Sequence, residues 1–137
     1  MSLSIKEVAL HDVWQLRQEV MYPDETLDFV KLEEDETGVH LGVYEGEELK
    51  TVISLFKNDG ELQFRKFATR VASQGKGYGT YLLEYVMKWA SENQIKRIWC
   101  NARATATGMY EKIGMRTTGY GWKKFGLDFI MMEKQFN

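Results

Sequence analysis

The sequence predicts a mixed α+β domain, and three observations support this fold class. Helical and strand-like segments alternate along the 137 residues. Three strand-like segments follow one another closely in the middle of the chain. A run of alternate glycines at 74–79 then joins the third strand to a strongly amphipathic helix. Segments in this order favour one α+β domain covering residues 1–137, with a crossover helix after the glycine run.

The chain opens with a short predicted strand at 3–8 and a helix from about residue 12. The apolar residues of this helix recur at helical spacing: Val13, Leu16 and Val20. Pro23 ends the helix, because proline restricts the residue before it and lacks an N–H. A second helical stretch is expected over 26–34. The acidic run at 33–36 is expected to be a solvated helix end rather than a metal site.

Three strands are predicted next, at 39–44, 49–56 and 61–69, because apolar and β-branched residues alternate there with polar ones. Glu45-Gly46-Glu47 is a turn between the first two strands. Asn58-Asp59-Gly60 is a strong hairpin turn between the second and third. These segments therefore form an antiparallel meander.

A helix at 78–93 follows the glycine run, with one continuous apolar stripe: Tyr78, Leu82, Tyr85, Val86 and Trp89. A strand is expected at 97–101, and a short helix at 106–113 closes on Gly114. Two final strands are predicted at 116–123 and 127–136.

Composition narrows the classes of function. The chain is 44% hydrophobic and 13% aromatic, which exceeds what a disordered chain tolerates. Its formal net charge of −2 gives no electrostatic reason to expect nucleic acid or a membrane as partner. Cys100 is the one cysteine and lies in an apolar strand-like segment, so we expect a buried, inert thiol. Without an apolar span or a signal-peptide pattern, the cytoplasm is the expected location.

The glycine run reads Gln-Gly-Lys-Gly-Tyr-Gly at 74–79. It matches neither a Rossmann fingerprint nor a P-loop. Glycines let backbone N–H groups approach a ligand, and the first turn of a helix offers unpaired donors and a positive dipole end. By itself the run is either a tight turn or a cradle for phosphate.

A second motif lies at 101–115, where Asn101, Ala106, Tyr110-Glu111-Lys112, Gly114 and Met115 are spaced as in Asn-x-x-x-x-Ala-x-x-x-Tyr-Glu-Lys-x-Gly-Phe, with Met115 for the aromatic residue. With the loop Gln-x-x-Gly-x-Gly, this block resembles the GNAT superfamily of N-acetyltransferases, whose loop reads Arg/Gln-x-x-Gly-x-Gly/Ala. The element order agrees with the GNAT fold over nearly the whole chain. The segments 16–23 and 35–42 are similar to a largely uncharacterised branch of the superfamily.

The resemblance implies a central, mostly antiparallel sheet flanked by helices, with one splayed strand pair. It implies acetyl-CoA as the acyl-donor substrate and no metal. The residues it would assign to the donor are Phe67, Ala68, Thr69, Gln74, Gly75, Lys76, Gly77, Tyr78, Gly79, Thr80 and Asn101. The strand residues and Asn101 would bond the pantetheine arm, and the loop would surround the pyrophosphate.

The resemblance also implies a general acid, Tyr110, which would protonate or polarise the departing thiolate. The base is where the sequence departs from well-known members, because Gln63 stands where they carry a glutamate. Glu61 or His40 could take this role, or water could relay the proton. Glu61 is otherwise a solvated turn residue, and His40 a hydrogen-bonded imidazole with a structural or substrate-contacting role.

The expected reaction is acetyl transfer to a primary amine by direct attack in a ternary complex, without Cys100 as acyl carrier. Candidate acceptor contacts are Arg17, Tyr22, His40, Arg65 and Trp122. Either arginine could bind an acceptor carboxylate or pair with a local glutamate. The acceptor is a small-molecule or peptide amine of open identity, and the final strands suggest a homodimer. The alternatives are a non-catalytic acyl-CoA-binding module or sensor, and a protein that binds ADP or ATP.

Overall fold

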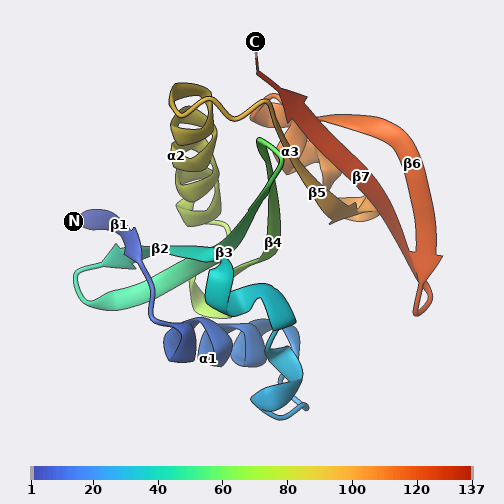
Figure 1. The fold of residues 1–137 in the computed structure, drawn as a ribbon. Coiled ribbons are helices and arrows are strands. Elements are labelled where there is room, and N and C mark those ends of the chain that lie inside the picture. Colours follow the sequence, from blue (N-terminus) through green and yellow to red (C-terminus); the bar gives the residue numbers. More distant parts are fainter. Residues whose placement is uncertain (1, 137) are drawn as a thin grey trace. The chain divides into compact units, whose positions relative to one another are not determined.

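The computed structural model describes residues 2–136. Its strands are β1 Leu3–Glu7, β2 Val39–Glu45, β3 Glu48–Asn58, β4 Glu61–Thr69, β5 Arg97–Arg103, β6 Arg116–Lys124 and β7 Leu127–Gln135. Its α-helices are α1 Leu10–Met21, α2 Tyr78–Glu92 and α3 Thr107–Lys112. Short 3₁₀ turns are η1 Asp28–Val30, η2 Glu33–Thr37, η3 Val71–Ser73 and η4 Ala104–Ala106. Figure 1 shows these elements along the chain.

The chain forms two compact units. The first covers the chain up to Phe56 together with Lys66–Leu82, and the second covers Lys57–Arg65 and the chain from Leu83 on. Strand β4 and helix α2 each contribute residues to both units. The prediction of a single domain over residues 1–137 stays a prediction.

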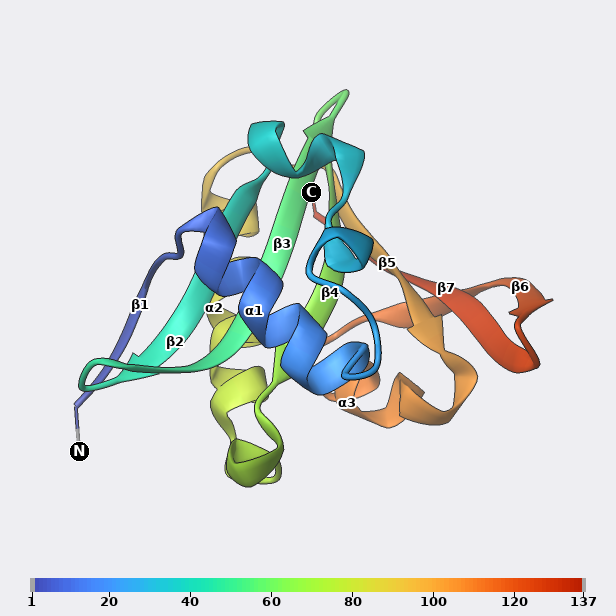
Figure 2. The same cartoon turned by 90° about the horizontal axis from the view of Figure 1, so that it is seen from below.

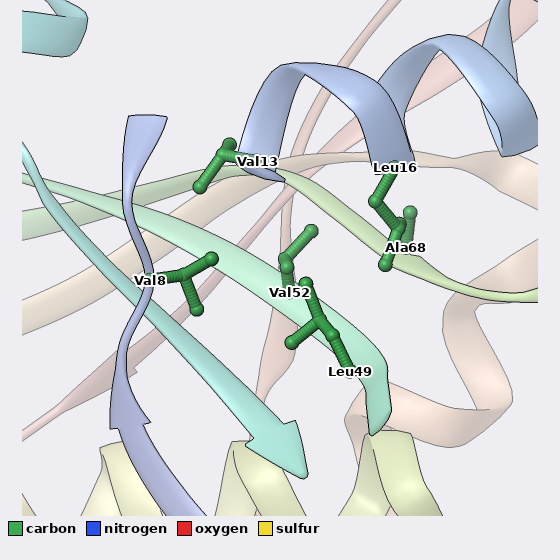
Figure 3. Packing of buried hydrophobic residues seen from close by; sticks show 6 residues of the cluster. All are labelled: Val8, Val13, Leu16, Leu49, Val52 and Ala68. Carbon is green, nitrogen blue, oxygen red and sulfur yellow. The ribbon is translucent and has the colours of Figure 1, made fainter. Parts of the chain in front are cut away.

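The first unit has the strand order β1-β2-β3-β4. Strand β1 pairs antiparallel with β2, Leu3 lying opposite Glu45, and β2 pairs antiparallel with β3. Helix α1 lies across these strands in Figure 2. Figure 3 shows how the side chains of one buried cluster in this unit meet: Val8, Val13, Leu16, Leu49, Val52 and Ala68. Burial of this apolar face fixes α1 on the sheet.

The second unit has the strand order β4-β5-β7-β6. Strands β4 and β5 run parallel, in register from Glu61 opposite Arg97 to Gln63 opposite Trp99. Strand β7 pairs antiparallel with both β5 and β6, and β6 and β7 form the long hairpin coloured orange to red in Figure 1. The parallel pair within otherwise antiparallel pairing is the pattern expected for the splayed strands. The predicted α+β class is confirmed.

Three local expectations differ from the structure. No α-helix covers 26–34: the described chain forms η1 and η2 instead, and Lys31 between them is extended. Within the acidic run, Asp35 is buried rather than solvated, and its carboxylate accepts the Leu32 N–H, which shapes the turn. On α2, Tyr85 and Trp89 are exposed, and the buried face consists of Tyr78, Leu82, Leu83, Val86, Met87 and Ala90.

Within residues 2–136, none of the helices is both long enough and apolar enough to cross a membrane.

Candidate active site

The glycine run forms an open loop in the first unit. Gly75 and Gly77 have φ angles of +75° and +91°, which residues with a side chain adopt only with strain. A Cβ at either residue would meet no described atom within 4 Å, apart from the immediate chain neighbours. Glycine is therefore needed here for its backbone angle, and the space beside the loop is left open.

Gly79 is needed for a different reason. A Cβ on this residue would lie 3.0 Å from the Phe67 ring, so glycine lets the first turn of α2 approach the end of β4. Because α2 begins at Tyr78, the amides that precede Tyr81 have no helical carbonyl one turn earlier, whereas the Tyr81 N–H donates to the Gly77 carbonyl oxygen. Together the loop and this turn present several N–H donors, which is the arrangement that binds a phosphate group.

The side chains of the loop contribute in different ways. Lys76 and Thr80 are exposed. Gln74 is exposed as well, but its Nε2 donates a hydrogen bond to the Thr69 carbonyl oxygen at 3.0 Å. This contact closes the loop on the end of β4, a structural role that its place in the motif did not reveal.

The end of β4 carries an irregularity that the sequence did not announce. Lys66 has a φ of +52°, uncommon for a residue with a side chain. Beyond it, Phe67, Ala68 and Thr69 complete the strand, and the Thr69 hydroxyl lies 2.9 Å from that of Thr51. No residue pattern marks a lysine for this conformation, so sequence reasoning missed it.

Lys66 also holds one of the predicted acceptor contacts. Its Nζ donates a hydrogen bond to the Tyr22 hydroxyl at 2.6 Å and lies 4.9 Å from the centre of the ring. Phe29 packs edge-on against the same ring. The chain after α1 is thereby tied to β4 within the first unit.

Arg17 is wholly buried, with 0% of its side chain exposed. It forms a bidentate ion pair with Asp35, at 2.7 Å and 2.9 Å. Its guanidinium also donates to the Val30 carbonyl oxygen and to the Ser54 hydroxyl. Of the two roles considered for Arg17, the internal ion pair is observed, but the partner is Asp35 rather than a glutamate. The expectation that it contacts the acceptor is wrong, because an acceptor cannot reach it.

His40 belongs to the same network. Its Nε2 lies 2.8 Å from the Asp35 carbonyl oxygen, which can only accept, so this nitrogen carries the proton. Its Nδ1 lies 2.8 Å from the Ser54 hydroxyl and accepts from it. Both ring nitrogens are engaged in a buried site. These contacts give His40 a structural role, and its roles as base and as acceptor contact stay predictions.

Asp35 is the centre of this network. Burial by itself raises the pKa of Asp35, but hydrogen bonds from Arg17, the Leu32 N–H and Trp14 outweigh it and lower the pKa to about 2. We refer to Trp14, Arg17, Asp35, His40 and Ser54 as the Arg17 network. It joins α1, η2, β2 and β3.

Tyr110 lies in α3, in the second unit, with 9% of its surface exposed. The Phe64 ring packs against it at 5.8 Å between centres. Burial raises the pKa of Tyr110 well above its ordinary value, with a smaller contribution from Cys100. Its phenol therefore keeps its proton at any physiological pH.

The other predicted residues of the second unit are placed as follows. Asn101 is exposed on β5, and Arg65 is half-buried on β4. Trp122 stacks on Phe129 in the terminal hairpin, with ring centres 5.9 Å apart. Burial raises the pKa of Cys100 to about 12, so its thiol stays protonated.

Glu61, the second candidate base, is paired. Its carboxylate accepts from Arg97 Nη1 at 3.1 Å and is 39% exposed. Arg97 is shared with Glu133, to which its Nε donates at 2.6 Å. Within residues 2–136, no cluster of three or more His, Cys, Asp or Glu side chains could hold a metal ion.

Comparison with known proteins gives the family. A model described as "Acetyltransferase (GNAT) domain" matches residues 12–136. The chain therefore belongs to the GNAT acetyltransferase family, and it is an N-acetyltransferase.

Relatives agree with this assignment. The chain is 26% identical over 136 residues to the uncharacterized N-acetyltransferase YitI of Bacillus subtilis, covering 93% of this chain and 87% of that protein. A putative N-acetyltransferase from Lactobacillus plantarum has a similar structure, with a TM-score of 0.86, 23% identity and full coverage of both chains. An acetyltransferase of Bacillus subtilis in complex with CoA has a TM-score of 0.78 at 18% identity, covering 99% of this chain and 100% of that one. The predicted GNAT fold is confirmed.

Proposed function

We propose that the protein transfers an acetyl group from acetyl-CoA to a primary amine, by direct attack in a ternary complex. The observation that carries this proposal is the open loop at 74–79, where left-handed Gly75 and Gly77 precede the first turn of α2. This geometry suits the diphosphate of the donor. Family membership supports the reaction class.

We assign the donor contacts as the motif predicts. The amides of the loop at 74–79 and the Thr80 hydroxyl would bind the diphosphate, with Lys76 free to add a charged contact. The backbone of Phe67, Ala68 and Thr69 would pair with the amides of the pantetheine arm. Asn101 would bond the same arm.

Tyr110 would act on the departing sulfur. As the amine nitrogen bonds to the thioester carbon, the carbon–sulfur bond breaks and sulfur takes the electron pair. A simple alkyl thiol has a pKa of about 8.5, which is well below the raised pKa of Tyr110. The phenol would therefore stabilise the thiolate chiefly by donating a hydrogen bond, and CoA leaves as thiolate or takes a proton from solvent.

The proton of the amine needs another acceptor. Glu61 is held by Arg97, and both ring nitrogens of His40 are engaged. We propose that water carries this proton away, which leaves Glu61 with a role in the ion pair. The buried thiol of Cys100, whose pKa is about 12, supports direct attack rather than an acyl-cysteine intermediate.

Tyr22, Arg65 and Trp122 remain proposed acceptor contacts. The class of acceptor stays open between small-molecule amines and peptide amines. A homodimer and a cytoplasmic location also stay proposals.

Calorimetry with acetyl-CoA tests the proposal at its root. Binding is expected, and no binding at millimolar concentration would overturn it. A panel of amines monitored by CoA release then identifies the acceptor class. If acetyl-CoA binds but no amine leads to CoA release, a non-catalytic module is favoured. If ADP or ATP binds and acetyl-CoA does not compete with it, a nucleotide-binding protein is favoured. Cys100→Ala is expected to retain turnover.

A further inference from the structure

The middle of the glycine loop, at 75–77, has no buried side chain to hold its shape. Gly75 and Gly77 are open on the Cα side, and Lys76 between them is exposed. A loop of this kind is flexible unless its two ends are fixed. The contacts at the two ends of the loop therefore determine how well its N–H groups are oriented in the ligand-free protein.

The chain that leads into the loop is fixed to β3 at Arg70, just before η3. The Arg70 N–H donates to the Lys50 carbonyl oxygen at 2.9 Å, and Arg70 Nε donates to the Leu49 carbonyl oxygen at 2.7 Å. Arg70 Nη1 also pairs with Glu19 of α1 at 2.7 Å. These three contacts hold the backbone where it leaves β4.

The end of the loop is fixed by one side-chain hydrogen bond. The Tyr78 hydroxyl donates to Glu45 Oε1 at 2.6 Å, and the Tyr78 side chain is buried. Tyr78 is the first residue of α2, and Glu45 is the last residue of β2. The hydrogen bond to Glu45 raises the pKa of the Tyr78 hydroxyl, which stays protonated and keeps donating.

We propose that Tyr78 and Glu45 are a positioning pair that presets the loop for the diphosphate of the donor. The pair fixes the first turn of α2 against the β2–β3 hairpin, and Arg70 fixes to the same hairpin the chain that leads into the loop. Preorganisation of this kind lowers the ordering cost of binding. The inference rests on the proposed function, because it assumes that the loop binds the diphosphate of CoA.

The pair is expected to strengthen the binding only of ligands that carry a diphosphate. Tyr78→Phe removes the hydroxyl and keeps the ring, so the packing of the side chain is preserved. The dissociation constant for CoA is expected to rise about three- to ten-fold, the usual worth of one hydrogen bond. Glu45→Ala should have the same effect, and the double variant should be no worse than either single one.

Two variants serve as controls. Glu45→Gln keeps an acceptor oxygen for the Tyr78 hydroxyl and is expected to restore CoA binding close to the unmodified level. Tyr85→Phe removes a hydroxyl from an exposed tyrosine of the same helix and is expected to change nothing.

The experiment measures CoA binding by calorimetry and pantetheine binding by NMR titration, which tolerates weak ligands. Pantetheine has the thiol arm but no diphosphate, so its dissociation constant should be equal in the unmodified protein and in Tyr78→Phe. If Tyr78→Phe weakens CoA and pantetheine binding equally, or leaves CoA binding unchanged, this inference is overturned and the proposed function is not. Absence of CoA binding by the unmodified protein would instead overturn the proposed function.

Discussion

Arg17 and Asp35 form a bidentate ion pair that is closed to solvent, with 0% and 1% of their side chains exposed. They lie 18 residues apart, on α1 and η2, and the pair also holds Ser54 and His40 through Arg17 and the Asp35 carbonyl. A buried charge that loses its partner is far more costly than the intact pair is favourable. The Arg17 network is therefore a buried polar support of the first unit.

Asp35→Ala is expected to lower the free energy of unfolding by about 3–5 kcal/mol, because it leaves the buried Arg17 charge without a partner. Urea denaturation followed by circular dichroism measures this loss. Glu36→Ala, at the exposed neighbouring position, is the matched control and should change stability by less than about 0.5 kcal/mol. Similar small losses in both variants would show that the network contributes little.

Stability should fall at acid pH through Asp35. Its pKa is lowered in the folded protein from an ordinary 3.8 to about 2, so the ion form is favoured by folding. The contribution is complete above about pH 4 and is lost as pH falls towards 2, an effect of about 2 kcal/mol. Denaturation of the unmodified protein and of Asp35→Asn should converge over this range. A constant difference between them would contradict the assignment.

Gly75→Ala is expected to weaken CoA binding about tenfold or more, because the strained loop would misdirect hydrogen bonds to a charged group. Gly126→Ala is its matched control: both glycines have a φ of +75° and open space at the Cβ position. Each substitution should cost about 1 kcal/mol of stability. Calorimetry with CoA should show weaker binding for Gly75→Ala alone. Equal weakening in both variants would show that general destabilisation, and not the loop, is the cause.

Tyr110→Phe is expected to lower kcat by about 100-fold with CoA affinity unchanged, as for the loss of one donor to a developing anion. Because burial raises the pKa of Tyr110, the kcat of the unmodified enzyme should show no loss from phenol ionisation up to about pH 10. Initial rates of CoA release across pH check both statements. A kcat close to that of the unmodified enzyme would remove Tyr110 from the mechanism.

Glu61→Gln should lower kcat by less than about tenfold, whereas loss of a true general base costs about 100-fold or more. The physical reason is that Glu61 is already paired with Arg97. Steady-state rates between pH 7 and 9 measure the effect. A larger loss that is rescued at high pH would restore Glu61 as the base.

The sequence predicted the strands, α1, α2 and the glycine loop well, because these depend on short-range patterns. The predicted helix at 26–34 is absent, because Lys31 is extended and interrupts the helical conformation. The Asp35 carboxylate then accepts a hydrogen bond from the Leu32 N–H. It also assigned Tyr85 and Trp89 to the buried face of α2, since both carry large apolar rings at helical spacing. Which side of a helix is covered depends on its neighbours, and both rings are exposed.

The sequence by itself determined the glycine loop and the Asn101–Met115 block, because in both the chemistry is set by residues close together along the chain. Only the tertiary structure decided the roles of Arg17 and His40. Both looked like residues for an acceptor, and both are held in the core by partners such as Asp35 and Ser54 on other segments. The physical reason is burial: a charged or titratable side chain serves a ligand when it can be reached, and a fold stabilises it internally when it cannot.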